Sequence, residues 1–161
     1  MLLSPKVFHL SFVELYQFTA MTFWLDVGIP SLSFKTDLIE SKLWFDVEKI
    51  EKVIYNLLSN SFKFTKEGGK ISISVSRHKV EFPELFSEEY CIAISDTGIG
   101  ISSKSANKVF TRFYHNGESK IMKGTGIGLH TVKNLVVLLG GFITIESKEG
   151  EGSNFKVTIR R

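Results

Sequence analysis

The chain has 161 residues, of which 43% are hydrophobic and 23% are charged, and its formal net charge is +3. This length is sufficient for one domain with a substantial core, and the composition excludes an intrinsically disordered chain. The net charge is small and the basic residues are scattered, so the sequence gives no reason to expect a nucleic-acid partner.

The first half of the chain is expected to hold two helices and two short strands. Residues 8–24 could form an amphipathic helix, and residues 31–37 and 41–45 are expected to be short strands. Asp46 is a predicted N-cap for a helix over 47–64, because apolar residues recur there with the 3.6-residue period. This helix carries the first group of candidate functional residues.

Two strands are predicted to follow this helix. After a turn at 66–69, residues 70–77 and 90–96 show the apolar–polar alternation that is typical of strands with one solvent-exposed face. The segment between them, 78–89, is predicted to be a long connection.

The last third of the chain is predicted to contain two helices and a hairpin. Residues 102–110 are expected to form a short helix, 111–123 a mobile polar loop, and 127–141 a strongly apolar helix that ends at a glycine pair. Residues 142–147 and 154–161 alternate again and predict a hairpin. This order of elements predicts an α+β two-layer sandwich, in which helices cover one face of a mixed, mostly antiparallel sheet.

We expect a single domain, with residues 1–30 as an N-terminal segment that includes a helix before the core, and 31–161 as the core. Cys91 is the only cysteine, so no internal disulfide can form. No apolar run approaches the roughly 18 residues of a membrane span, and the first residues lack the apolar core of a secretion signal. We therefore expect a cytoplasmic domain, and the sequence leaves open whether a parent protein is anchored in the inner membrane.

Polar residues interrupt the apolar stretch NLLSNSFKFT. Asn56, Asn60 and Lys63 lie within roughly 60° of one another on the predicted helix. Asparagine is a poor helix former, so two of them beside the apolar face require a reason. One explanation is that the amides satisfy nearby backbone groups in the core. The other is a half-buried ledge of neutral oxygens and one cation that suits Mg²⁺ and phosphate, because Mg²⁺ prefers oxygen ligands and keeps several waters.

Two glycine clusters, DTGIGI (96–101) and GTGIGL (124–129), are candidates for ligand contact. The first could be an ordinary turn after a strand. The second opens a predicted helix, where free backbone N–H groups and the helix dipole favour an anion such as phosphate. Neither the P-loop motif nor a dinucleotide-binding strand–turn–helix unit is present.

Together these segments resemble the ATP-binding catalytic domain of bacterial sensor histidine kinases, which has the Bergerat (GHKL) fold. The matching segments, in the order of the family, are NLLSNSFKFT (56–65) for the N box, DTGIGI (96–101) for the G1 box, FTRFY (110–114) for the F box and GTGIGL (124–129) for the G2 box. GEGSNF (150–155) is similar to the final glycine-rich element. The resemblance covers residues 30–161 and implies a domain that binds ATP and Mg²⁺ and donates the γ-phosphoryl group in two-component signalling.

The resemblance also implies a role for individual residues. Asn60 would hold Mg²⁺ through its side-chain oxygen, and Asn56 would reach metal-bound water or phosphate. Lys63 would neutralise phosphate charge, and Phe64 would stack on the adenine. Asp96 would accept a hydrogen bond from the adenine 6-amino group. Guanine has a carbonyl at that edge, so ATP would be preferred over GTP by about 1–3 kcal/mol.

Asn56, Asn60 and Lys63 are thus the implied catalytic residues, and the nucleotide would contact a larger set. That set is Phe64, Asp96, Gly98, Gly100, Ile101, Lys123, Gly124, Thr125, Gly126, Gly128, Leu129 and Ser153. Within it, the G1 glycines would let the backbone approach the base and sugar, and the G2 glycines would let the 111–123 loop close as a lid. Ser153 would support the adenine pocket.

The F box is expected to anchor this lid. Phe110 and Phe113 are predicted to be packing residues, and Arg112 is predicted to meet either phosphate or a partner helix. His115 stands where family members often carry a basic residue, and Lys120 could compensate for its pH-dependent charge. The four histidines show no metal-ligand spacing, and we interpret His78 and His130 as structural or surface residues.

The chain departs from the family pattern in three places. Ser61 replaces the usual alanine and Phe64 the usual tyrosine, and both changes keep size and shape. No phosphoacceptor H box occurs, because His9 lacks the flanking acid and proline. The accepting histidine is therefore expected on a separate dimerisation or histidine-phosphotransfer domain, with a response-regulator receiver domain as an indirect partner.

Three other functions remain open at this point. The first is a hydrolytic ATPase of the same fold, but Asn56 stands where such relatives carry a glutamate, and an amide cannot take a proton from water. The second is a nucleotide-binding regulatory module without catalysis, and the third is an anti-sigma-type serine kinase.

Overall fold

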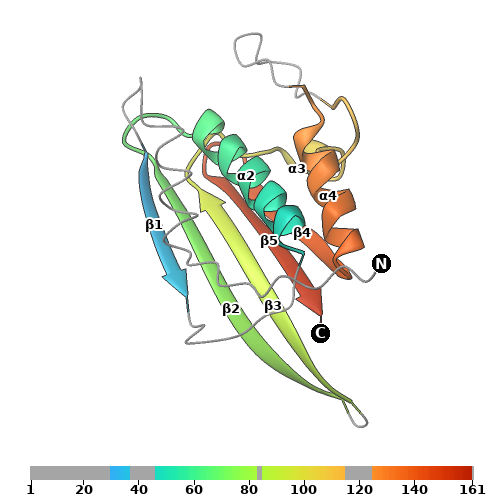
Figure 1. Ribbon diagram of the computed structural model, residues 1–161. Coiled ribbons are helices and arrows are strands. Elements are labelled where there is room, and N and C mark those ends of the chain that lie inside the picture. Colours follow the sequence, from blue (N-terminus) through green and yellow to red (C-terminus); the bar gives the residue numbers. More distant parts are fainter. Residues whose placement is uncertain (1–29, 37–45, 83–84, 115–124, 161) are drawn as a thin grey trace.

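The structure is a computed structural model that describes residues 30–36, 46–82, 85–114 and 125–160. Its elements are β1 (Ser31–Thr36), α2 (Val47–Phe64), β2 (Lys70–Phe82), β3 (Leu85–Asp96), α3 (Ser103–Ala106), α4 (Gly128–Leu138), β4 (Gly141–Lys148) and β5 (Gly152–Arg160). Figure 1 shows one sheet with α2 and α4 lying on the same face. The predictions made for 8–24, 41–45 and 115–123 lie outside the described residues.

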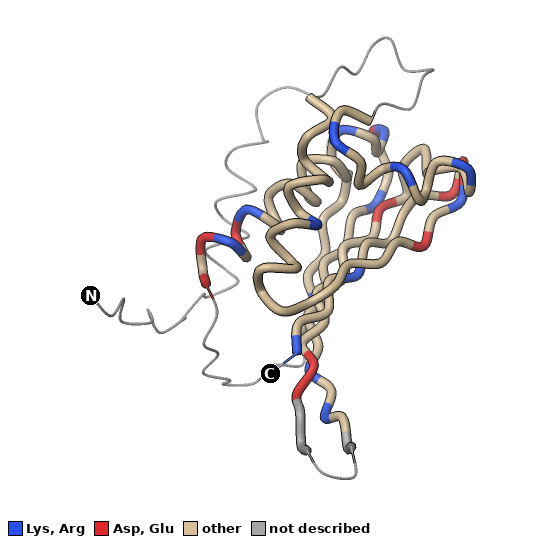
Figure 2. Tube along the Cα trace, turned by 90° about the vertical axis from the view of Figure 1, so that its right-hand side faces the viewer, with Lys and Arg blue, Asp and Glu red and all other residues tan. Residues whose placement is uncertain are grey.

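The five strands are ordered β1-β2-β3-β5-β4 across the sheet. β1 runs parallel to β2, and every other neighbouring pair in the described sheet is antiparallel. The view turned by 90° shows the helices on one side and the strands on the other (Figure 2). The predicted α+β two-layer sandwich with a mixed, mostly antiparallel sheet is therefore confirmed.

Helix α2 forms where the sequence predicts it. The side chain of Asp46 accepts a hydrogen bond of 3.2 Å from the backbone N–H of Lys49, which satisfies one free donor of the first turn. The helix ends because Thr65 is extended, and the Thr65 N–H caps it by donating to the Ser61 carbonyl at 3.0 Å. The buried residues are those that the period predicts, namely Ile50, Val53, Ile54, Leu57, Leu58 and Ser61.

The helix-facing side of the sheet supplies the other half of the core. The alternate residues that are buried against the helices are Ile71, Ile73, Val75, Ile92, Ile94, Phe155, Val157 and Ile159. Asp96 and Ser153 continue this alternation at the end of β3 and the start of β5, where they are paired across the strands. The period of two therefore places both polar side chains on the same side of the sheet as α2.

The segment between the two predicted strands is not a long connection, so that prediction is wrong. β2 and β3 pair without a break from Ile71 opposite Asp96 to Phe82 opposite Leu85. Opposite charges face each other across this extension, as where Lys79 is paired with Glu88, and such pairs stabilise neighbouring strands. This hairpin extends beyond the two helices, as the lower part of Figure 1 shows.

Both of the later helices are shorter than predicted. Within 102–110, only the four residues of α3 are helical and the rest form turns. α4 stops at Leu138 because Gly140 takes a left-handed φ of +76°, a common way to end a helix. The buried side chains of α4 are Val132 and Val136, on the side that contacts α2.

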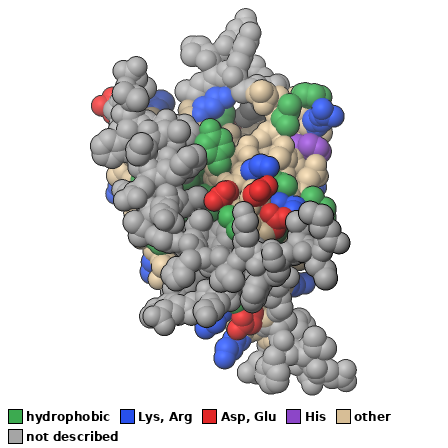
Figure 3. Space-filling view, in the orientation of Figure 1, with side chains coloured by type: hydrophobic (Ala, Val, Ile, Leu, Met, Phe, Trp, Pro, Cys, Tyr) green, Lys and Arg blue, Asp and Glu red, His purple; other side chains and the backbone are tan. Residues whose placement is uncertain are grey.

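The described surface carries both signs of charge. Seen from the helix side, basic and acidic side chains lie close to one another rather than in separate patches (Figure 3). Asp46 and Lys49, for example, form an ion pair within the first turn of α2. None of the described helices is both long and apolar enough to cross a membrane.

Candidate functional site

The first glycine cluster packs against the end of α2. The Ile99 N–H donates to the Phe64 carbonyl oxygen at 3.1 Å, and the Ser61 hydroxyl donates to Asp96 Oδ2 at 3.2 Å. Gly98 is buried, and a Cβ atom at this position would lie only 2.5 Å from the Phe64 carbonyl oxygen. DTGIGI is therefore fitted tightly to α2, with the Asp96 carboxylate beside Ser61.

The second glycine cluster contacts the same helix, about two turns closer to the N-terminus of α2. The Asn56 Nδ2 group donates to the Lys52 carbonyl oxygen at 2.7 Å, and Asn56 Oδ1 lies 3.0 Å from where a Cβ atom of Gly128 would be. Gly128 is the first residue of α4. The first N–H groups of a helix have no partner within it, and the helix dipole makes this end positive. The start of α4 beside Asn56 is therefore suited to bind phosphate.

Asn60 lies between these two contacts, one turn after Asn56 and directly before Ser61. Its side chain is half-buried, and it makes no hydrogen bond to any other described residue. A free amide oxygen can bind Mg²⁺ that keeps water and phosphate ligands. Among the described residues, no three His, Cys, Asp or Glu side chains are grouped so that they could hold a metal ion. The Asn60 side-chain oxygen therefore fits the role of a single protein ligand to Mg²⁺.

Lys63 and Phe64 contact each other at the end of α2. The Lys63 ammonium lies 5.0 Å from the centroid of the Phe64 ring, a cation–π arrangement. The resemblance implied that these residues serve opposite ends of the nucleotide, the phosphates and the adenine. The structure brings the two side chains together on the Asp96 side of Asn60, and their separate roles stay predictions.

The Asp96 carboxylate is held by donors from three segments. Its Oδ1 accepts from the Gly98 N–H at 2.9 Å, and its Oδ2 accepts from Ser61. Burial raises the pKa of Asp96, and hydrogen bonds from Gly98, Ser61 and the Ser153 backbone partly offset this effect. A carboxylate fixed in this way recognises a ligand edge that carries N–H donors.

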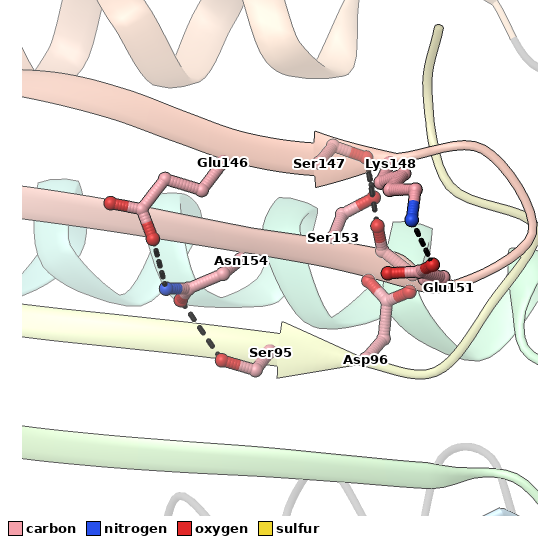
Figure 4. Close-up of a pocket in the computed structure, with 9 residues that line it drawn as sticks. Ser95, Asp96, Glu146, Ser147, Lys148, Glu151, Ser153 and Asn154 are labelled. Carbon is pink, nitrogen blue, oxygen red and sulfur yellow. Dashed lines mark hydrogen bonds and ion pairs between the residues drawn. The ribbon is translucent and has the colours of Figure 1, made fainter.

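Asp96 and Ser153 also line a hollow of about 400 Å³ at the ends of β3, β4 and β5. Figure 4 shows its other walls, which come from Ser95, Glu146 and Asn154 on the sheet face turned away from the helices and from the turn between β4 and β5. Asn56, Asn60 and Lys63 do not line it. Of the predicted site residues, this hollow is therefore lined only by Asp96 and Ser153.

Comparison with known families agrees with this arrangement. Residues 45–161 match the family described as histidine kinase-, DNA gyrase B-, and HSP90-like ATPase. The chain belongs to this family. Within the ATPase family, its relatives and structural neighbours identify it as an ATP-binding domain of the sensor histidine kinase type.

Two relatives illustrate how this ATPase domain is used. Histidine kinase P4 of Formosa agariphila is 36% identical over 137 residues, which cover 82% of this chain and 9% of the relative. Sensor histidine kinase WalK of Bacillus subtilis is 37% identical over 116 residues, which cover 71% of this chain and 18% of WalK. The chain thus spans less than a fifth of the length of either relative.

Solved structures share the fold of this ATPase domain. The catalytic domain of histidine kinase ThkA superposes with a TM-score of 0.72 at 24% identity, covering 96% of this chain and 93% of ThkA's. Full-length ShkA, whose structure contains AMPPNP, superposes with a TM-score of 0.72 at 16% identity, covering 98% of this chain and 31% of ShkA's. At these identities the likeness concerns the fold.

In the F box of this ATPase domain, the two phenylalanines differ. Phe110 packs edge-to-face on Phe155, with ring centroids 6.4 Å apart, so its predicted packing role is confirmed. Phe113 does not pack as predicted, because it is 59% exposed; its φ is +61°. The Arg112 guanidinium lies 4.7 Å from the centroid of the Phe113 ring.

The F box is hydrogen-bonded to the start of α4. The Phe113 N–H donates to the Gly126 carbonyl oxygen at 2.9 Å, and His130 Nδ1 lies 3.2 Å from the Phe110 carbonyl oxygen. His130 Nε2 lies 3.2 Å from Asn134 Nδ2. Because a carbonyl only accepts, these contacts fit a neutral imidazole that donates from Nδ1 and accepts at Nε2. The structural role predicted for His130 is confirmed.

The remaining predicted contact residues are only partly described. Lys123 and Gly124, with His115 and Lys120, lie outside the described residues. Thr125 is exposed, and Gly126 is half-buried. Ile101 and Leu129 are half-buried and pack on the core.

Two functional candidates were missed by the sequence reasoning. Ser61 contacts Asp96, although its replacement of alanine was interpreted as a change without consequence. Ser147 contacts Ser153, with the two hydroxyl oxygens 3.0 Å apart, and no motif includes it. The only sequence signal for either was a hydroxyl at an apolar position of an element that faces the core.

Gly100 offers a direct test of how the G1 box packs. Its φ is +66°, and a Cβ atom there would lie 2.0 Å from the Lys148 carbonyl oxygen. Gly100→Ala is therefore expected to lower the free energy of unfolding by about 3 kcal/mol or more, since the strain of a left-handed residue adds to a backbone overlap. Gly140→Ala is the matched control, because φ is +76° and nothing lies within 4 Å. Gly140→Ala should lower the free energy of unfolding by only about 1–2 kcal/mol. Equal losses in urea unfolding would contradict the packing described here.

Proposed function

We propose that this domain binds Mg²⁺-ATP and donates the γ-phosphoryl group to a histidine on a separate dimerisation domain. The observation that carries this proposal is the placement of both glycine clusters on one helix, with Asn60 between them. Asn56 beside Gly128 and Ser61 beside Asp96 are separated by about 8 Å along α2 at a rise of about 1.5 Å per residue. One nucleotide can span that distance, with its base at Asp96 and its phosphates at Asn56.

In the proposed complex, each part of ATP meets a group of matching chemistry. Asp96 accepts from the adenine 6-amino group, Asn60 holds Mg²⁺ through its side-chain oxygen, and the first N–H groups of α4 face the phosphates. The bound Mg²⁺ neutralises charge on the triphosphate. The transferred group then passes to an imidazole nitrogen, forming a P–N bond as the bond to the ADP oxygen breaks. This reaction needs positioning and charge neutralisation more than a base.

Transfer is favoured over hydrolysis by the identity of Asn56. Hydrolysis needs a group that orients and deprotonates water, and a carboxamide cannot accept that proton. The Asn56 amide is also held by Lys52, which leaves only its oxygen facing α4. We infer that the domain works in the cytoplasm, where ATP is available, with a receiver domain as the later acceptor of the phosphoryl group.

The test is incubation of the chain with γ-labelled ATP and Mg²⁺, with and without a histidine-bearing dimerisation domain supplied in trans. We expect ATP to bind with roughly micromolar or weaker affinity, equivalent to about 8 kcal/mol or less. Label should appear only on the added domain, and it should be labile in acid, as a phosphohistidine is.

The other outcomes identify the other functions. Steady release of phosphate by the chain alone would favour a hydrolytic ATPase. Nucleotide binding without labelling of any histidine domain would favour a regulatory module. Absence of nucleotide binding would overturn the proposal.

A further inference from the structure

The hydroxyl of Ser61 is an unusual group for its position. Ser61 is 1% exposed and lies on the face of α2 that also buries Leu57 and Leu58. A hydroxyl there loses its contact with water, and this costs free energy unless it makes a hydrogen bond. Its partner is Asp96 Oδ2. Because a carboxylate can only accept, Ser61 must give its single proton to Asp96.

The hydroxyl of Ser147, near Asp96, also has a fixed hydrogen-bond direction. Ser147 Oγ contacts the Ile101 N–H at 2.8 Å, the Gly152 carbonyl oxygen at 2.8 Å and Ser153 Oγ at 3.0 Å. The amide can only donate and the carbonyl can only accept, so the Ser147 proton goes to Gly152. Ser153 must then give its own proton to Ser147, and only lone pairs of Ser153 remain for a ligand. Figure 4 shows this pair beside Asp96.

We propose that Ser61 and Ser147 are positioning residues that make the base-binding end of the site accept hydrogen bonds without donating any. Asp96 and Ser153 would then offer lone pairs only, which suits the 6-amino edge of adenine and opposes the 6-carbonyl edge of guanine. An unconstrained serine could rotate its proton towards a carbonyl and weaken this selection. This inference rests on the proposed function, since it concerns the same nucleotide site.

The test compares three nucleotides: ATP, GTP and purine riboside triphosphate, which lacks the 6-amino group. Dissociation constants are measured by calorimetry for the wild-type chain and for Ser61→Ala. The wild type should bind ATP roughly tenfold or more tightly than the purine analogue. In Ser61→Ala this preference should fall by roughly threefold to tenfold, while affinity for the purine analogue stays the same.

Two controls separate positioning from general support of the fold. Ser59→Ala removes a half-buried serine of the same helix that makes no hydrogen bond to a described residue, and it should keep the wild-type preference. On an Asp96→Asn background, Ser61→Ala should change the preference no further, because its effect acts through the carboxylate. Thermal unfolding of each variant checks that the domain is folded.

Ser147→Ala provides an independent arm. Without Ser147, the Ser153 hydroxyl can donate its proton to the 6-carbonyl oxygen of guanine. The preference for ATP over GTP should therefore fall by roughly threefold or more. Unchanged nucleotide preferences in both Ser61→Ala and Ser147→Ala would overturn the inference. An equal loss of affinity for all three nucleotides would also overturn it. If the wild-type chain bound none of the three nucleotides, that result would overturn both the proposed function and this inference.

Discussion

Replacing Asp96 with asparagine is expected to weaken ATP binding by roughly 5-fold to 150-fold, equivalent to about 1–3 kcal/mol. The asparagine oxygen can still accept from Gly98, but its NH₂ group would face Ser61 and the adenine amino group with donors instead of lone pairs. GTP affinity should change less, because guanine does not present an amino donor at this edge. Calorimetric titration of both nucleotides checks the result, and equal ATP affinity in the variant would remove Asp96 from the site.

The same substitution should not destabilise the domain at neutral pH. Burial raises the folded-state pKa of Asp96 above the ordinary value of 3.8, so ionising this carboxyl costs more free energy in the folded domain than in the unfolded chain. Stability from such a group is present below the unfolded pKa and is lost as the pH rises through the folded pKa. Asparagine is neutral at every pH, so Asp96→Asn should melt at or above the wild-type temperature at pH 7. A clear loss of thermal stability would show instead that the ionised group supports the fold.

The raised pKa also predicts a pH dependence of binding. As the pH falls, Asp96 takes up a proton at a higher pH than an ordinary aspartate, and the protonated carboxyl loses one of its acceptors. ATP affinity of the wild type should therefore fall with the pH, and the ratio between wild type and Asp96→Asn should shrink. A ratio that stays constant through the acid range would contradict this titration.

Asn60→Ala is the second substitution with a large expected effect. It removes a half-buried side-chain oxygen placed between the two glycine clusters, so Mg²⁺ would lose its only proposed protein ligand. Phosphotransfer to the added histidine domain should fall by about 100-fold or more, since charge neutralisation by a metal supplies several kcal/mol. Initial rates of labelling at saturating ATP measure this loss.

Asn60→Asp separates loss of the ligand from loss of the fold. The carboxylate keeps an oxygen for Mg²⁺ but adds a negative charge near the phosphates. With Mg²⁺ it should retain more transfer than Asn60→Ala, whereas in EDTA it should bind ATP more weakly than Asn60→Ala because like charges repel. If both variants transferred at the wild-type rate, Asn60 would have no metal role.

The parts of the fold that the sequence predicted are those in which local pattern and tertiary packing agree. In α2, the cap at Asp46 and the apolar period both point to the same helix, and the structure buries the predicted face. The polar edge of this helix could be identified because Asn56 and Asn60 violate the preferences of a core helix. The packing of the first cluster against it follows from a close approach to the Phe64 carbonyl oxygen that a Cβ atom at Gly98 would block, while a Cβ atom at Gly128 would lie 3.0 Å from the Asn56 side-chain oxygen.

The features that the sequence did not predict depend on contacts between distant residues. The β2–β3 hairpin extends beyond the helices, and its far part is held by pairing between the two strands. Phe113 is exposed and takes a left-handed φ, neither of which its hydrophobicity predicts. Ser61 could be assigned only when β3 placed Asp96 beside it, 35 residues further along the chain.

The hydrogen bonds from Phe113 to Gly126 and from His130 to Phe110 join the two sides of the segment between the F box and α4. The entropic cost of closing a flexible chain between two fixed points grows only slowly with its length, at about 0.6 kcal/mol for each doubling. Residues inserted between these anchor points, such as a tetracysteine tag for a dye, should leave the sheet and α2 intact. The domain thus has a natural graft point close to its phosphate-binding end, where a reporter could follow nucleotide turnover.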